Sequence, residues 1–315
     1  MVRPRILFMG TPLFAVPPLR ALVERGFDVV GVVTQPQKPF GRGGKLIPAP
    51  VKEFALRWNL GLLEPVSIRE ERFVNKLKSL SLDLIVVAAY GKMLPESVLG
   101  IPRFGCVNLH ASILPSYRGA APVNWAIIKG EKITGVTTML MDAGMDTGPV
   151  LLAEKVEIGR DETAGELSIR LSEAGASLLA RTVEFFLEGK ITPAPQDDKK
   201  ATYAPPLKKE DGRIDWNLSA KEMENRVRGL CPWPGAYTFW RGKSLKIHRG
   251  AAADGREVLA LGGLRPGEVV AAGGVIVVGC GKGVFEIKEL QLEGKRRMGA
   301  VEFLRGHRLG KEAFV

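Results

Sequence analysis

The stretch that decides the fold is LDLIVVAA at residues 82–89, an apolar run with little alternation between apolar and polar positions. Strands that are buried on both faces have this pattern, whereas half-exposed strands alternate. Similar runs recur through the first 190 residues, with the sequences RILFMG at 5–10, DVVGVVT at 28–34, CVNLH at 106–110 and GVTTMLM at 135–141. Together these runs predict a mainly parallel sheet in an α/β domain.

Apolar residues at helical spacing fill the intervals between these runs, at 14–25, 51–58, 69–79, 121–129 and 163–188. The last of these helices is the longest and is predicted to stop at Gly189, which a lysine follows. In such sheets, ligands bind at the carboxyl ends of the strands. We therefore look for the functional site in the segments that directly follow the predicted strands.

The composition of the sequence changes after Gly189. Residues 190–206 are rich in proline and charge, which predicts an extended, solvated connector. A short helix with a serine cap is predicted at 219–229, followed by short strands at 236–240, 244–248, 267–270, 275–280 and 284–292. We predict an N-terminal domain at 1–189, a linker at 190–206 and a small OB-like β-barrel at 207–315.

Length and composition agree with two globular domains. A chain of 315 residues exceeds what one core usually holds, and 45% apolar with 25% charged residues is ordinary for a folded protein. The N-terminus lacks the long apolar segment of a signal peptide, and no apolar run reaches the length of a membrane span. The three cysteines, Cys106, Cys231 and Cys280, are far apart, which favours a reducing compartment and no metal. We expect a cytoplasmic protein that acts as a monomer.

The net charge of +11 indicates an acidic partner such as nucleic acid. Residues 207–315 hold 20 Lys and Arg against 13 Asp and Glu, an excess of +7, whereas the first 206 residues hold 25 against 21. The C-terminal third therefore carries most of the excess.

The most informative segment for chemistry is NLHASILPSYRGAA at 108–121, which continues the run that begins at Cys106. Asn108 and His110 are two residues apart on an extended chain, so both side chains leave the same face. An amide donor can stabilise an oxyanion, and an imidazole can transfer or hold a proton near neutral pH. A lone histidine can equally be a structural residue, but His110 is the only histidine in the first 206 residues.

A second polar segment, MDAGMDTG at 141–148, follows the apolar run GVTTML, which we expect to be a parallel strand. Asp142 fits ordinary turn chemistry. Asp146 is favoured as a functional carboxylate because a carboxylate near an imidazole stabilises its charged form and fixes its orientation. Spacing alone does not establish that Asp146 meets His110.

The segments NLHASILPSYRG at 108–119 and DAGMDTG at 142–148, occurring together and in this order, resemble motifs of the tetrahydrofolate-dependent formyltransferase family. The resemblance implies a Rossmann-like formyltransferase fold for the catalytic domain and 10-formyltetrahydrofolate as the formyl donor. It assigns Asn108, His110 and Asp146 to the surroundings of the formyl carbon. It also assigns folate binding to Ser112, Ile113, Leu114 and Pro115, where Ile113 departs conservatively from leucine. No metal is implied.

The basic segment QPQKPFGRGGKLIPAP at 35–50 bears on which amine accepts the formyl group. By composition it is equally a solvated loop. In the branch of the family that acts on initiator methionyl-tRNA, a basic loop of this type contacts the acceptor end. The resemblance extends to Arg42, Lys45 and Lys52, and to CPWPGAYT at 231–238 in the C-terminal barrel. Formylation of methionyl-tRNA for translation initiation is therefore expected, with SLKIHR and GKRRM as candidate phosphate contacts.

Two alternatives remain open from the sequence. An enzyme acting on a sugar nucleotide shares the site and can carry a C-terminal barrel, although the basic loop and the overall charge argue against it. A non-catalytic RNA-binding protein would explain the charge. However, it gives no reason for the combination of Asn108, His110 and Asp146, and the turn beginning at Gly10 is not the G-x-G-x-x-G phosphate turn.

Overall fold

The computed structural model describes residues 3–37, 39–40, 45–46, 48–253, 263–310 and 312–315. The chain forms two compact units, which are described separately below. The first unit contains residues 1–122, 133–157 and 168–205, and the second contains 123–132, 158–167 and 206–315. The expected division into a domain at 1–189, a linker at 190–206 and a domain at 207–315 stays a prediction.

The first unit is built on a seven-stranded sheet with the order β10-β9-β7-β6-β1-β2-β5. The neighbouring pairs within β7-β6-β1-β2-β5 are all parallel, which confirms the predicted mainly parallel sheet. β9 and β10 run antiparallel to their neighbours. The strands are β1 (Arg5–Gly10), β2 (Asp28–Val33), β5 (Leu62–Leu63), β6 (Leu84–Ala88), β7 (Cys106–His110), β9 (Ile133–Leu140) and β10 (Val150–Glu157).

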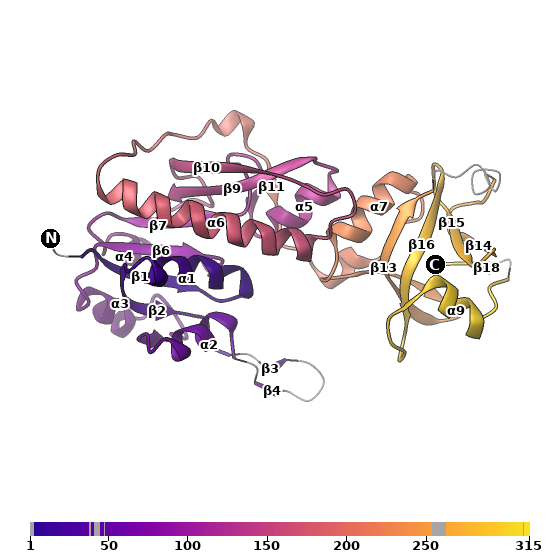
Figure 1. Cartoon of the computed structure of the whole chain (residues 1–315), viewed down its shortest axis with the longest axis horizontal. Coiled ribbons are helices and arrows are strands. Elements are labelled where there is room, and N and C mark those ends of the chain that lie inside the picture. Colours follow the sequence, from indigo (N-terminus) through magenta and orange to yellow (C-terminus); the bar gives the residue numbers. More distant parts are fainter. Residues whose placement is uncertain (1–2, 38, 41–44, 47, 254–262, 311) are drawn as a thin grey trace. The chain divides into compact units, whose positions relative to one another are not determined.

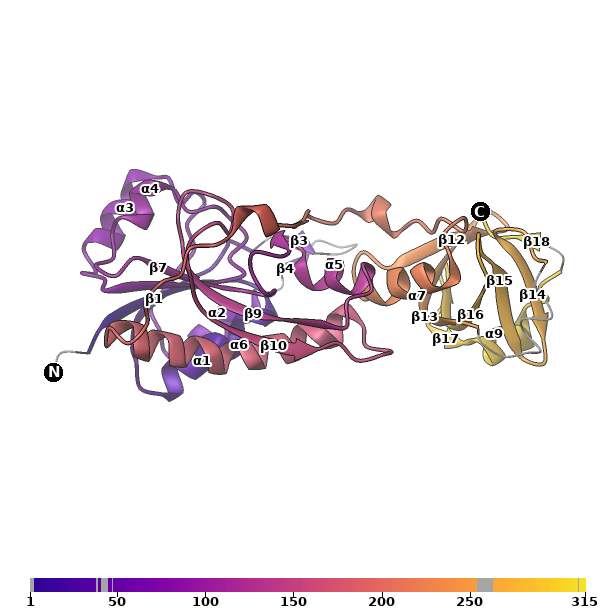
Figure 2. The same cartoon turned by 90° about the horizontal axis from the view of Figure 1, so that it is seen from above.

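Helices cover both faces of this sheet (Figures 1 and 2). α1 (Val16–Glu24) and α6 (Ala164–Leu187) lie on one face, and α3 (Glu71–Lys78) and α4 (Glu96–Leu99) lie on the other. On the α3 side, a buried hydrophobic cluster joins the helices to the sheet. In it Phe73, Leu77 and Val98 pack with strand residues such as Met9 and Ile85. α6 ends where the sequence predicts, since Gly189 adopts a φ of 71° and its amide bonds to the Phe186 carbonyl.

Several short elements of the first unit were not predicted. β8 (Arg118–Gly119) pairs in parallel with β11 (Tyr203–Ala204), and β3 (Pro39–Phe40) pairs with β4 (Lys45–Leu46).

The predicted helix at 51–58 is present as α2 (Pro50–Arg57). It begins one residue early, with proline in its first turn, where a missing amide costs nothing.

The second unit is an antiparallel sheet with the order β12-β13-β16-β15-β14-β18, with β17 added against β16. Its strands are β12 (Ala236–Trp240), β13 (Lys243–Ala252), β14 (Glu268–Ala272), β15 (Val275–Gly279), β16 (Val284–Leu292), β17 (Met298–Gly299) and β18 (Glu312–Ala313). Its helices are α5 (Pro122–Ile128), most of which belongs to this unit, α7 (Ala220–Gly229) and α9 (Ala300–Gly306). The five predicted strands and the helix at 219–229 are all present.

The sheet of the second unit curls until its two edges meet. Just beyond β18, Val315 exchanges backbone hydrogen bonds with Phe239 of the opposite edge strand β12, at N···O distances of 2.9 and 3.2 Å. Thr238 adds a hydroxyl bond to the same Val315 carbonyl. Closure of this kind satisfies edges that would otherwise be exposed, as expected for the predicted small barrel.

Helix α7 begins at the predicted cap. The Ser219 hydroxyl accepts a bond from the Glu222 amide, and the Glu222 carboxylate accepts one from the Ser219 amide at 2.8 Å. This reciprocal capping satisfies two amides that the first turn leaves unpaired. Among the described parts of the chain, no helix is long and apolar enough to span a membrane.

Candidate active site

Strand β7 delivers Asn108 and His110 to the same face of the sheet. The intervening Leu109 packs directly over Gly175 of α6, so the two polar side chains project from the face opposite α6. Asn108 is 9% exposed and His110 is 6% exposed. Among the described residues, none hydrogen-bonds the Asn108 side-chain amide, which leaves its N–H groups available to a ligand.

His110 lies between two hydrogen-bond acceptors, one facing each ring nitrogen. Its Nε2 is 2.9 Å from the Tyr117 carbonyl oxygen, which can only accept, so Nε2 carries a proton. Its Nδ1 is 3.6 Å from Asp146 Oδ2. The carboxylate orients the imidazole by facing Nδ1. At 3.6 Å the pair is too long for a direct hydrogen bond, so Nδ1 can also interact with a third atom.

Asp146 reaches His110 from a loop that does not follow a parallel strand, contrary to the expectation from the sequence. β9 is antiparallel to β7, with Leu140 opposite Val107, so the loop 141–149 starts beside the amino end of β7. It then extends to the carboxyl end of β7. There Asp146 adopts a φ of 54° and its Oδ2 accepts a 2.8 Å bond from the Gly119 amide.

Asp142 in the same loop has the turn role that its position predicts. Its Oδ1 accepts bonds from the Gly144 amide at 3.0 Å and the Thr147 hydroxyl at 2.6 Å. These contacts stabilise the loop locally, as short aspartate side chains do in turns. The two aspartates of the loop therefore have different environments, and only Asp146 faces the histidine.

The segment predicted to bind folate follows β7 directly and is tightly held. The Ser112 hydroxyl donates to the Ser116 carbonyl at 2.6 Å, and Thr137 of β9 bonds both the Ser112 carbonyl and the Leu114 amide. Ser112 and Leu114 are buried, whereas Ile113 and Pro115 are half-buried. The segment therefore has a fixed shape beside His110. The Ser112 hydroxyl is already hydrogen-bonded within the segment.

The residues predicted to contact tRNA are only partly described. Arg42 lies outside the described residues, as does the side chain of Lys45. Lys52, in α2, forms a 2.6 Å ion pair with Glu64, so a phosphate would compete with that carboxylate. In the second unit, Arg296 and Arg297 pair with Glu302 and Glu289, whereas Lys246 is exposed on β13.

Two buried cysteines, Cys106 on β7 and Cys280 in the second unit, take no part in this arrangement. Burial raises the pKa of the Cys106 thiol to about 12 and that of Cys280 to about 11, which leaves both as unreactive thiols. Among the described residues, no group of three or more His, Cys, Asp or Glu side chains is placed to hold a metal ion. Cys106 and Cys280 pack as small apolar residues.

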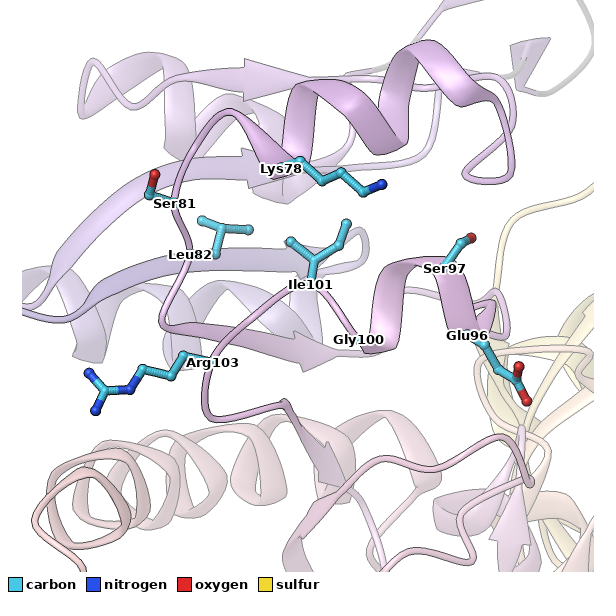
Figure 3. A pocket seen from close by; sticks show the side chains of 8 residues that line it. All are labelled: Lys78, Ser81, Leu82, Glu96, Ser97, Gly100, Ile101 and Arg103. Carbon is cyan, nitrogen blue, oxygen red and sulfur yellow. The ribbon is translucent and has the colours of Figure 1, made fainter.

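A surface hollow lies between α3 and α4 (Figure 3). Its lining includes Leu82 and Arg103, which precede β6 and β7 respectively. It therefore opens at the amino ends of these strands, the edge opposite His110, and it includes none of the predicted site residues. In a sheet of this type, ligands gather at the other edge.

Two residues that support the site were missed in the sequence. Arg118 is 2% exposed, and Gln196 lies in the segment that we predicted as a solvated connector. Gln196 hydrogen-bonds the Asp146 loop and Arg118. A single glutamine in a proline-rich stretch gives no periodic signal, so only the fold reveals this contact. Segment 190–206 is mostly extended and exposed, as predicted, but it is tied to the first unit.

Comparisons with known proteins identify formyltransferases as relatives over nearly the whole chain. The family described as formyl transferase matches residues 4–183, and the family described as formyl transferase, C-terminal domain, matches residues 206–308. A methionyl-tRNA formyltransferase of Geobacter sulfurreducens is 51% identical over 97% of this chain and 94% of its own length. One of Caldanaerobacter subterraneus is 49% identical over 97% of both chains.

Solved structures share the fold at lower identity. The sugar 3N-formyl transferase WlaRD superposes with a TM-score of 0.67 at 17% identity, covering 94% of this chain and all of the other. HypX from Aquifex aeolicus, crystallised with tetrahydrofolic acid, gives a TM-score of 0.64 at 20% identity. The match covers 99% of this chain and 50% of HypX.

Proposed function

Because the chain belongs to the formyltransferase family, we propose that it transfers the formyl group of 10-formyltetrahydrofolate to the amino group of initiator methionyl-tRNA. The product is N-formylmethionyl-tRNA, which serves translation initiation, and this role implies a cytoplasmic protein. The observation that carries the chemistry is His110, held between the Tyr117 carbonyl and the Asp146 carboxylate beside an unengaged Asn108 amide.

The geometry supports direct attack of the amine on the formyl carbon. Negative charge then develops on the formyl oxygen, and two donors are available for it: the Asn108 side-chain amide and the Nδ1–H of His110. Asp146 orients the imidazole and accepts a proton from the attacking amine. His110 or water returns a proton to the departing folate nitrogen. No covalent bond to the protein is needed.

The segment 112–115 supports the expected folate subsite. Ser112 and Leu114 form its buried base, and the half-buried Ile113 and Pro115 offer apolar surface to a planar ring. Because the Ser112 hydroxyl and carbonyl are engaged internally, we propose that Ser112 holds the shape of this subsite. The direct contacts then come from its neighbours.

The identity of the acceptor is supported by the relatives that share both units of the chain and are named methionyl-tRNA formyltransferases. The charge of +7 over residues 207–315 suits a polyanion. We propose Arg42, Lys45 and Lys52 as tRNA contacts in the first unit, with Arg42 the strongest because bidentate phosphate binding favours arginine.

The test is a choice among acceptors. Purified protein with labelled 10-formyltetrahydrofolate is offered methionyl-tRNA of the initiator and elongator types, glycinamide ribonucleotide and an amino-sugar nucleotide. We expect label to enter methionyl-tRNA, preferentially the initiator, and not the two small acceptors. Label in the sugar nucleotide with none in tRNA would replace the proposed acceptor but keep the reaction class.

A further inference from the structure

A buried arginine, Arg118, directly precedes Gly119, whose amide bonds the Asp146 carboxylate. Arg118, on β8, is 2% exposed, and burial of a charge is costly unless it is paired and hydrogen-bonded. Its Nη2 donates to Asp198 Oδ1 at 2.7 Å and to Gln196 Oε1 at 2.8 Å, and its Nε donates to the same Gln196 oxygen at 3.1 Å. The guanidinium therefore holds the oxygen end of the Gln196 amide with two donors.

The other end of that amide holds the Asp146 loop. Gln196 Nε2 donates to the Asp146 carbonyl at 2.8 Å and to the Gly148 carbonyl at 2.7 Å. Arginine can only donate and carbonyl oxygens can only accept, so this network fixes the orientation of the amide. Position 196 therefore requires a side chain with an acceptor facing Arg118 and two N–H donors facing the loop carbonyls. Glutamine has these groups and the necessary length.

Asp146 is thereby held at both its backbone and its side chain. Its φ of 54° is uncommon for a residue with a side chain and persists where neighbouring contacts enforce it. Gln196 bonds its carbonyl, and the amide of Gly119, adjacent to Arg118, bonds its carboxylate at 2.8 Å. The placement of the carboxylate 3.6 Å from His110 depends on these contacts.

Gln196 comes from a segment that is itself fastened to the first unit on both sides. Ala194 exchanges two 2.8 Å backbone bonds with Val150, next to the loop, and Tyr203 pairs with Arg118. Resting on the proposed function, we infer that Gln196, oriented by Arg118, is a positioning residue that holds Asp146 in register with His110 for formyl transfer. The segment after α6 then completes the active site instead of only linking two domains.

The discriminating variant is Gln196→Glu. It preserves size and the acceptor toward Arg118, and it adds an ion pair there, but it turns both loop contacts into repulsions between oxygens. We expect kcat to fall roughly 10- to 100-fold, because small misplacements of a reacting group have effects of this size. KM for methionyl-tRNA and for the folate should change little, since neither substrate contacts Gln196 in this account.

Gln291→Glu is the matched control. Gln291 likewise donates to a carbonyl, that of Lys295, and its oxygen pairs with a ring nitrogen of His248, but it lies in the second unit. The kcat of the Gln291→Glu variant at saturating tRNA should equal that of the unaltered protein. Equal kcat for Gln196→Glu and the unaltered protein would overturn the inference.

Hydrogen exchange tests the inference without any substrate. Amides of residues 141–149 should exchange at least several-fold faster in Gln196→Glu than in the unaltered protein, with β1 and β6 unchanged. Unchanged exchange in the loop would refute the inference, whatever acceptor the enzyme uses. Conversely, faster loop exchange in a protein that formylates no tRNA would preserve the positioning role and reject the proposed function.

Discussion

At the residue scale, the role of Asp146 depends on its charge and not only on its shape. The Tyr117 carbonyl accepts a hydrogen bond from His110 Nε2, and the Asp146 carboxylate faces Nδ1. Asp146→Asn retains an acceptor for the Gly119 amide but removes the charge. We expect kcat to fall about 100-fold or more in steady-state formylation, with KM values near those of the unaltered protein.

Asp142→Asn is the control for that variant because it changes the same residue type in the same loop. Asparagine can still accept the bonds from Gly144 and Thr147 that Asp142 accepts now. Activity should stay within a few-fold of normal. If both substitutions reduced kcat equally, the effect would lie in the loop and not in the charge facing His110.

These residues also mark the limit of inference from sequence. Asn108 and His110 could be paired in advance because a strand places residues i and i+2 on one face. The contact between His110 and Asp146 could not, because it depends on a loop that starts at the wrong end of β7 and turns through a positive φ. Gln196 was missed because its contacts are 48 to 78 residues away in the chain.

At the element scale, buried strands were the easiest features to predict. Apolar runs located β1, β2, β6 and β7 almost to the residue, since both faces of a parallel sheet are covered. The antiparallel direction of β9 was missed because pairing direction is set by neighbours and not by composition. Strand β10 was missed as well, although its half-exposed alternation is typical of an edge.

Helix α7 provides a stability test at the same scale. Glu224 accepts bonds from Lys221 and from the Ala252 amide of β13. Burial by itself raises the pKa of Glu224, but these bonds, with the charges of Lys221 and Arg228, outweigh it and lower the pKa below its usual 4.5. The folded state therefore binds its proton less readily than the unfolded state does.

It follows that Glu224 stabilises the second unit above pH 4.5 and that this contribution is lost as the pH falls through the lowered value. Glu224→Gln should remove this part of the acid sensitivity and reduce stability at pH 7 by roughly 1 to 2 kcal/mol. Exchange of β13 amides between pH 7 and pH 4 measures both effects. The exposed Glu210→Gln is the control, and equal acid sensitivity of the two variants would contradict this role.

At the scale of the whole molecule, charge bears on the partner more than on the fold. The chain carries +11, with the larger share in residues 207–315, although several arginines there are already paired with glutamates. Binding of tRNA should weaken steeply with salt, with a linear fall of log K against log salt concentration as counterions are released. Filter binding from 50 to 200 mM salt tests this, and a flat response would exclude phosphate contacts as the main source of affinity.

We propose that this chain formylates methionyl-tRNA through the Asn108, His110 and Asp146 arrangement. The most direct measurement compares single-turnover formylation and tRNA affinity for the unaltered protein, Asn108→Ala and the exposed control Asn75→Ala. We predict that the unaltered protein and Asn75→Ala formylate equally, while Asn108→Ala is about 100-fold slower with unchanged tRNA affinity. An Asn108→Ala protein as fast as the unaltered one, or an unaltered protein that binds tRNA without formylating it, would contradict the account.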